Sequence, residues 1–245
     1  VIDKQVNSLI LAGRGGIGKT HSVLTALAKA GKTNVNTCSA RLVADVETGD
    51  DDDEVETKVN ARINSSAGDY VVIKGHMSAA ALYREMYFNS NKIFVFDDCD
   101  SILKDETAVN LLKAALDTYE TRVISWYKAG NGESDLPSSF VFHGQVIIIS
   151  NKDLDDINEA VLTRAFNIDL GMSKAERIER MRMVLADVMD HIDMDIKEDA
   201  INFMDENKEL TNNINFRALM QIITIRNSAG PNWKRLAMYT MMNDR

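Results

Sequence analysis

At positions 13–20 the chain reads Gly13-Arg14-Gly15-Gly16-Ile17-Gly18-Lys19-Thr20. This run fits the pattern G-x-x-x-x-G-K-[ST] at every fixed position. Residues 7–12 before it are mostly apolar and predict a short buried strand. Residues 18–30 predict a helix that ends near Gly31. Between a strand and a helix, such a loop lets backbone N–H groups surround phosphate oxygens. The run therefore predicts a phosphate-binding loop; the alternative is a glycine turn that binds nothing.

Individual residues of this loop have expected roles toward a nucleoside triphosphate. Lys19 would reach the β- and γ-phosphates, and the Thr20 hydroxyl would ligate Mg²⁺. The remaining contacts to the nucleotide are expected from Gly13, Gly15, Gly16, Ile17, Gly18 and His21. The predicted cofactors are therefore ATP and Mg²⁺.

The composition limits the class of protein. A chain of 245 residues with 45% hydrophobic content can form one large domain or a domain with a smaller partner. The net charge of −9 argues against a surface that binds nucleic acid throughout, although it leaves room for a local basic channel. Cys38 and Cys99 form no metal or redox pattern, which is typical of the reducing cytosol. No signal peptide is visible, and no apolar run approaches the roughly 18 residues that span a bilayer. We expect a cytoplasmic protein without a membrane partner.

Residues 1–170 alternate strand-like and helix-like patterns, which predicts an α/β domain. The predicted strands are 7–12, 70–74, 92–97, 145–150 and 166–170, and the predicted helices are 18–30, 78–88, 105–120 and 156–164. Most of these strands are continuous apolar runs, which favours a parallel sheet covered by helices on both faces. The expected fold is therefore a three-layer α/β sandwich.

Residues 171–245 have a different pattern. Ser173 and Glu176 form a capping box. Apolar residues then recur at helical spacing, at Ile178, Met181, Leu185 and Val188 and again at Phe216, Leu219, Met220 and Ile223. A final helix is expected after Pro231, and no strand pattern is present. These residues predict a small all-helical domain.

Two segments do not fit the sheet. Residues 33–68 contain the acidic run 50–54 and few large apolar residues, which predicts a solvated, flexible insertion, with a metal site as the alternative. Residues 122–127 and 140–143 are β-like and flank a glycine-containing stretch. The segment 122–144 therefore predicts a β-hairpin with a long tip.

Polar side chains follow two of the predicted strands. Ile93-Phe94-Val95-Phe96 is followed by Asp97 and Asp98. After a phosphate loop, Asp97 is expected to hold Mg²⁺ through its hydration shell, and Asp98 to act as the general base that polarises a water. The strand 145–150 leads to Asn151, whose amide could orient water or contact the γ-phosphate; an ordinary turn Asn is the alternative.

These motifs, followed by Arg164 and a helical domain, resemble the AAA+ ATPases over nearly the whole chain except the acidic insertion. The resemblance implies an α/β nucleotide-binding domain at 1–170 and a helical lid at 171–245. It also implies that Asn151 is sensor 1, that Arg164 is an arginine finger and that Arg217 is sensor 2 on the lid. For each arginine, an ordinary surface position is the alternative. The stretches 74–78 and 96–100, with Leu82 and Tyr83, look most like AAA+ ATPases of tailed bacteriophages, which would place the protein in the bacterial cytoplasm.

An arginine finger acts on the γ-phosphate bound by a neighbouring subunit, so the resemblance implies a homo-oligomeric ring, often hexameric in the family. Most members carry Asp-Glu where this chain carries Asp97-Asp98; superfamily 3 viral helicases resemble this pair, so hydrolysis is expected, at a slow rate. The expected substrate is a nucleic-acid or protein complex. Trp126, Tyr127 and Lys128 could contact nucleic acid, or the two aromatic residues could pack on the sheet.

Three alternatives stay open. A superfamily 3-like DNA helicase would carry a basic pore hairpin, but Glu133 and Asp135 lie in the predicted tip. A signalling switch like the STAND NTPases would usually carry an Arg where this chain has Ser150 and Asn151. A scaffold that binds ATP without turnover is the third alternative.

Overall fold

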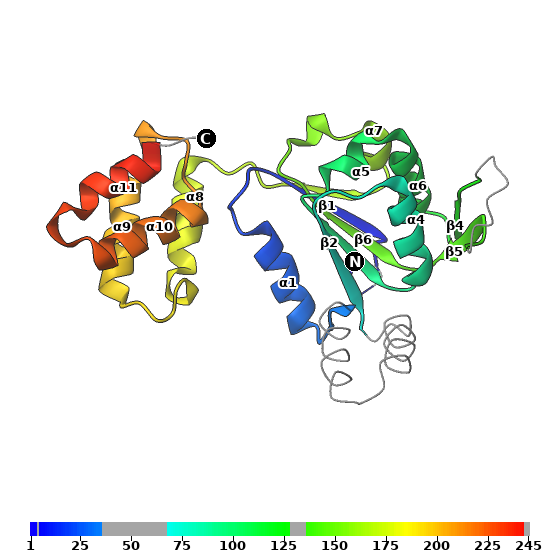
Figure 1. Ribbon diagram of the computed structural model, residues 1–245, viewed down its shortest axis with the longest axis horizontal. Coiled ribbons are helices and arrows are strands. Elements are labelled where there is room, and N and C mark those ends of the chain that lie inside the picture. The colour runs from blue at the N-terminus through cyan, green and yellow to red at the C-terminus, as the bar shows by residue number, and fades with distance from the viewer. Residues whose placement is uncertain (4, 36–67, 128–135, 243–245) are drawn as a thin grey trace, which may run out of the picture. The chain divides into compact units, whose positions relative to one another are not determined.

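The computed structural model describes residues 1–3, 5–35, 68–127 and 136–242 (Figure 1). The chain divides into two compact units. The first consists of Val1–Gly13 and Thr20–Asp169, and the second of Arg14–Lys19 and Leu170–Arg245. Most of the predicted phosphate loop thus groups with the C-terminal helices.

The first unit is built on a five-stranded sheet. Its strands are β1 (Ser8–Ala12), β2 (Tyr70–Lys74), β3 (Ile93–Asp97), β6 (Gln145–Ile149) and β7 (Phe166–Asp169). They lie in the order β2-β3-β6-β1-β7, and every neighbouring pair is parallel. The predicted parallel α/β fold is confirmed, and every predicted strand end lies within one residue of the observed one.

Helices cover both faces of this sheet (Figure 1). They are α1 (Lys19–Lys29), α4 (Ala79–Phe88), α5 (Asp100–Lys104), α6 (Glu106–Leu116) and α7 (Glu159–Leu162). Because side chains alternate along a strand, Phe94 and Phe96 pack in the core shared with α4, α5 and α6. Val95 packs in the other core, with Val23 and Leu27 of α1.

The helices differ from the predicted ones in three places. The helix predicted at 105–120 ends at Leu116, because Asp117 has an extended ψ of 148°. The helix predicted at 156–164 is the four-residue α7, preceded by a 3₁₀ turn at Leu154–Asp156. The short helix α5 follows β3 directly and was not predicted.

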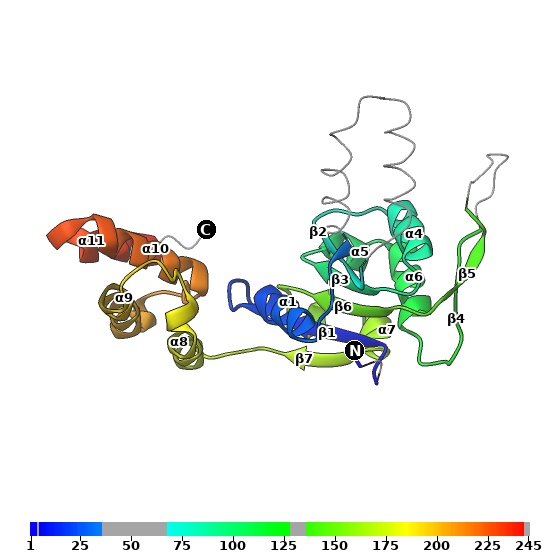
Figure 2. The ribbon, with the colours of Figure 1, turned by 90° about the horizontal axis from the view of Figure 1, so that it is seen from below.

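A two-stranded antiparallel sheet lies where the sequence predicts a hairpin. It pairs β4 (Arg122–Ser125) with β5 (Ser139–Phe142), beside α4 and α6 (Figure 2). The buried guanidinium of Arg122 donates hydrogen bonds to the carbonyls of Ala115 (2.7 Å) and Gly144 (2.6 Å). Burial lowers the pKa of Arg122. These bonds attach the ribbon to α6 and to the start of β6.

The aromatic residues of this ribbon have different environments. The Trp126 ring meets the Tyr83 ring edge-on at 5.5 Å, whereas Tyr127 is 76% exposed. Trp126 therefore packs against the protein, as one of the two alternatives expects, whereas Tyr127 does not. Lys128, Glu133 and Asp135, and most of the predicted acidic insertion, lie outside the described residues.

The C-terminal part of the second unit is helical in its described residues, with its own apolar core. Its helices are α8 (Lys174–Met183), α9 (Met194–Glu206), α10 (Phe216–Ser228) and α11 (Trp233–Met242). The capping box at Ser173 and Glu176 begins α8. The expected helical run to Val188 is wrong: α8 ends at Met183 and a 3₁₀ turn follows at Leu185–Asp187, which still buries Leu185. Helix α9 was not predicted.

Candidate functional site

Thr20 and Asp97 meet in the first unit. Thr20 lies in the first turn of α1, and Asp97 is the last residue of β3. The Thr20 hydroxyl donates a hydrogen bond of 2.7 Å to Oδ1 of Asp97. Because the hydroxyl donates its proton to the carboxylate, the lone pairs of its oxygen stay available to a cation. The two residues predicted to hold Mg²⁺ are therefore adjacent.

Asp98 and Asn151 form a second pair. The Asn151 amide donates a hydrogen bond of 2.5 Å from Nδ2 to Oδ1 of Asp98. Strand register explains the pairing: Asp97 lies opposite Ile149 in the neighbouring parallel strands β3 and β6, so the residues that follow each strand meet at one edge. The Asp98 N–H also donates to the Ile149 carbonyl, at 3.2 Å.

Asp98 has an uncommon backbone conformation. Its φ is +55°, in the left-handed region, and Asp and Asn enter this region more readily than other non-glycine residues. The turn directs the Asp98 side chain to Asn151 instead of continuing the strand. A strained residue at the end of a sheet strand, beside a second polar group, is a common feature of functional sites.

The phosphate loop has the backbone of an anion-binding turn. Gly16 and Gly18 have φ values of +76° and +87°. Successive N–H groups in such turns form concave anion sites. Lys19 is 6% exposed, and its ammonium group donates a hydrogen bond of 2.9 Å to the Arg14 carbonyl. The loop therefore orders its own lysine.

Within the second unit, the start of α10 contacts this loop. The Phe216 N–H donates a hydrogen bond of 2.9 Å to the Gly16 carbonyl. Asn215 caps α10 by accepting a hydrogen bond from the Ala218 N–H at 3.0 Å, and its side chain lies against Gly16. A Cβ atom at Gly16 would come within 2.9 Å of the Asn215 Cβ. Two constraints therefore require glycine here: the positive φ and the capping side chain.

Gly16→Ala is expected to weaken ATP binding by about tenfold, because the strained backbone and the displaced Asn215 together cost about 1–2 kcal/mol. Gly31→Ala is the matched control, since its φ is +71° but no atom lies within 4 Å of the added Cβ. Titration with a fluorescent ATP analogue measures the affinity of both variants, and Gly31→Ala should bind as the wild type does. Equal affinities in the two variants would contradict the requirement for glycine at position 16.

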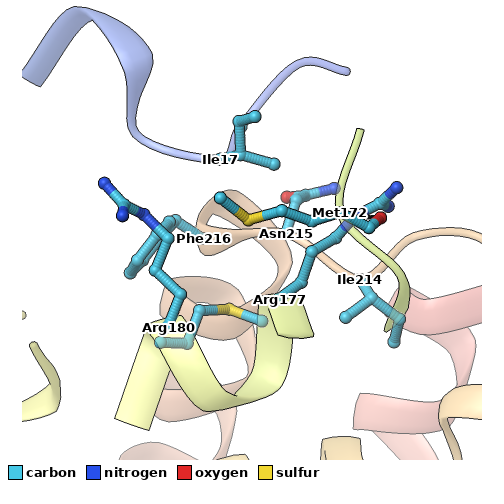
Figure 3. Close-up of a pocket in the computed structure, with 9 residues that line it drawn as sticks. Ile17, Met172, Arg177, Arg180, Ile214, Asn215 and Phe216 are labelled. Atoms are coloured by element: carbon cyan, nitrogen blue, oxygen red, sulfur yellow. Dashed lines mark hydrogen bonds between the residues drawn. The ribbon is translucent and has the colours of Figure 1, made fainter. Parts of the chain in front are cut away.

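A shallow pocket lies between this loop, α8 and the start of α10, within the second unit. Figure 3 shows Arg177 and Arg180 rising from α8 toward the loop that carries Ile17, with Met172 between them. Arg177 also donates from Nε to the Met172 carbonyl at 3.0 Å. Burial, and secondarily the positive charge of Arg14, lower the pKa of Arg177. Two arginine side chains therefore lie beside the predicted phosphate loop.

The structure does not bring every predicted residue to these pairs. Arg217 is exposed on α10 and is not among the residues that line the pocket. Arg164 donates from Nη1 to the Ala160 carbonyl at 2.8 Å, and its own carbonyl accepts from Ser8. His21 is exposed on α1, where its ring lies 3.5 Å from the Thr25 hydroxyl.

The positions of Arg177, Arg180 and Lys74 were not predicted from the sequence. For the two arginines a signal was present: the capping box begins α8, and positions three apart on a helix share one face. For Lys74 the signal is weaker, because its place beside Asp97 depends on the pairing of β2 with β3.

The residues present fit a nucleoside triphosphate with Mg²⁺. Thr20 and Asp97 supply the oxygen ligands that Mg²⁺ prefers, already in contact with each other. The loop supplies a buried ammonium group and a backbone with positive φ at two glycines. In the described parts of the chain, no helix combines the length and the apolar character needed to cross a bilayer.

Comparisons with known proteins agree with this geometry. The family model described as "ATPase family associated with various cellular activities (AAA)" matches residues 9–174, more than half of the chain. The chain is also 27% identical, over 256 aligned positions, to an uncharacterized 36.7 kDa protein from the nrdC-mobD intergenic region of Enterobacteria phage T4. That match covers 97% of this chain and 69% of the phage protein. Because the family model covers more than half of the chain, the chain belongs to the AAA family of ATPases.

Proposed function

We propose that the protein binds ATP with Mg²⁺ at residues 13–20, hydrolyses it, and works as a ring of identical subunits that remodels a nucleic-acid or protein complex. The observation that carries the hydrolytic part is the pair of contacts at one edge of the sheet. Thr20 contacts Asp97, and Asn151 contacts Asp98. A metal-ligand pair beside a candidate base and an amide is the set of groups that phosphoryl transfer to water requires.

Each residue has a separate task in this proposal. Lys19 and the loop N–H groups bind the phosphates, while Thr20 and Asp97 hold Mg²⁺, which when bound neutralises charge on the phosphate oxygens. Asp98 accepts a proton from the attacking water, and the Asn151 amide holds the Asp98 carboxylate in place. Asp98 is one methylene shorter than the Glu most members carry, so slow turnover is expected.

The decisive measurement is phosphate release from ATP by the wild-type chain and by its Asp98→Asn variant. Release that requires Mg²⁺ and disappears in the variant supports the proposal. ATP binding without release would favour the scaffold.

The proposal of a ring rests on Arg164 as an arginine finger for a neighbouring subunit. Among the described residues, its guanidinium bonds to the Ala160 carbonyl, close to its own position in the chain, and not to Asp97, Asp98 or Asn151. An arginine that serves the site of a neighbouring subunit would need no contact with the site of its own chain. An arginine supplied in this way contributes about 10³–10⁵ in rate.

Mixing Arg164→Ala subunits with Asp98→Asn subunits is expected to restore part of the ATPase activity that each variant lacks alone. Where an Asp98→Asn subunit presents Arg164 to an Arg164→Ala subunit, the shared site has both groups intact. Phosphate release measured across mixing ratios checks this, with a maximum expected near equal amounts. A flat response at every ratio would contradict a finger acting between subunits.

The class of target can be identified by testing which molecule stimulates the ATPase activity. ATPase rates would be measured with single-stranded DNA, double-stranded DNA and an unfolded protein. Stimulation by DNA favours a role in nucleic-acid remodelling and keeps the helicase alternative, whereas stimulation by unfolded protein favours a protein target. A nucleotide switch predicts no stimulation by any of the three.

A further inference from the structure

Both carboxylate oxygens of Asp97 accept bonds from protein groups. The Thr20 hydroxyl donates to Oδ1 at 2.7 Å. The Lys74 ammonium group lies 2.8 Å from Oδ2 and forms an ion pair with it. The predicted metal ligand therefore already has a cation on one of its oxygens, supplied by the chain itself.

The pairing of strands in the sheet explains why Lys74 lies beside Asp97. Lys74 is the last residue of β2 and lies directly opposite Asp97 in the parallel register with β3. Paired residues of neighbouring strands direct their side chains to the same face. The Cys99 thiol donates a hydrogen bond of 3.2 Å to the Ile73 carbonyl, which attaches the end of β2 to the segment after β3. The ion pair is thus set by backbone pairing.

The two partners are buried to different extents. The Asp97 side chain is 6% exposed, and the Lys74 side chain is 61% exposed. A buried carboxylate loses hydration and needs a compensating charge. The lysine side chain is long and mostly in water, so it can leave the carboxylate at small cost in hydration. An incoming cation can therefore take the place of the ammonium group.

We propose that the Lys74 ammonium group competes with Mg²⁺ for Asp97, so that Lys74 sets how strongly ATP binding depends on the metal. This inference rests on the proposed function, because it takes Asp97 as part of the Mg²⁺ site. Lys74 is a positioning residue: it acts on the nucleotide only through Asp97. It supplies the compensating charge of Asp97 until the metal arrives, and its positive charge opposes the metal at close range.

The test compares the affinity for a fluorescent ATP analogue in excess Mg²⁺ with the affinity in EDTA. The ratio of the two affinities measures the contribution of the metal. In Lys74→Met this ratio is expected to rise at least threefold over wild type, because no ammonium group opposes the metal. Lys74→Arg, which keeps the charge, should stay within twofold of wild type. Lys29→Met, at the other end of α1 from Thr20, controls for the loss of one positive charge.

A purely structural role for Lys74 would change both affinities equally and leave the ratio unchanged. An unchanged or lower ratio in Lys74→Met would therefore overturn the inference. In an Asp97→Asn background, Lys74→Met should leave the ratio unaltered, and a persisting rise would also overturn it. Thermal melting of each variant checks the fold. Failure of the wild-type chain to bind the analogue at any Mg²⁺ concentration would instead overturn the proposed function itself, and this inference with it.

Discussion

Asp98→Asn is expected to lower the rate of ATP hydrolysis by about 100-fold or more while leaving ATP affinity within about threefold of wild type. General bases contribute roughly 10²–10⁴ in rate, and an amide cannot accept the proton of the attacking water. The substitution is well matched in shape. Asn tolerates the φ of +55° at this position as Asp does, and its carbonyl oxygen can accept the same hydrogen bond from Asn151. The variant therefore removes the base and little else.

The measurement is single-turnover phosphate release together with the binding of a fluorescent ATP analogue. Asp100→Asn is the control, because it removes the same charge two residues further along, in the first turn of α5. Alanine at position 98 would be a poorer choice, because it adds backbone strain of about 1–2 kcal/mol in the left-handed region. If Asp98→Asn hydrolyses ATP at the wild-type rate, the base lies elsewhere in the site.

Lys19→Ala is expected to weaken ATP binding by about 100-fold or more. A buried ammonium group that meets phosphate oxygens makes charge-assisted hydrogen bonds worth about 1.5–3 kcal/mol each, and alanine removes all of them. The same change removes the bond from Lys19 to the Arg14 carbonyl, so the loop loses an internal link as well. Both effects act in the same direction.

Isothermal titration with ATP and Mg²⁺ measures this loss. Lys29→Ala is the control on the same helix: it removes a lysine from the last turn of α1, and ATP affinity should stay at the wild-type value. Melting curves of the two variants should be similar if the fold is intact. Micromolar affinity retained by Lys19→Ala would contradict the assignment of residues 13–20 as the phosphate loop.

The sheet could be predicted closely because its strands are signalled locally. A strand buried on both faces needs an unbroken apolar run, and Ile93–Phe96 and Val146–Ile149 have this pattern within a few residues. Helix ends were predicted less well. Helix α8 ends at Met183 although apolar spacing continues, because the 3₁₀ turn at Leu185–Asp187 buries Leu185 with different hydrogen bonding.

Some residues of the candidate site could also be predicted from local sequence, and others could not. The sequence alone pointed to the phosphate loop, Asp97, Asp98 and Asn151. Each lies at the end of an apolar strand or within two residues of it, or opens a helix. The residues that contact them from distant parts of the chain could not be predicted. Lys74 reaches Asp97 from another strand, and Phe216 reaches the Gly16 carbonyl from a helix about 200 residues further along the chain. The roles of all these residues, and of Arg164 and Arg217, stay predictions.

By itself, the sequence determined the parallel α/β fold, the phosphate loop and the polar residues at the strand ends, because these features depend on residues that are neighbours in the chain. Only the tertiary structure decided that Thr20 bonds to one oxygen of Asp97 and Lys74 to the other, and that Asn151 bonds to Asp98. Those contacts depend on which strands lie side by side and in what register. Register is set by packing and hydrogen bonding across the whole sheet, and no short stretch of the chain encodes it.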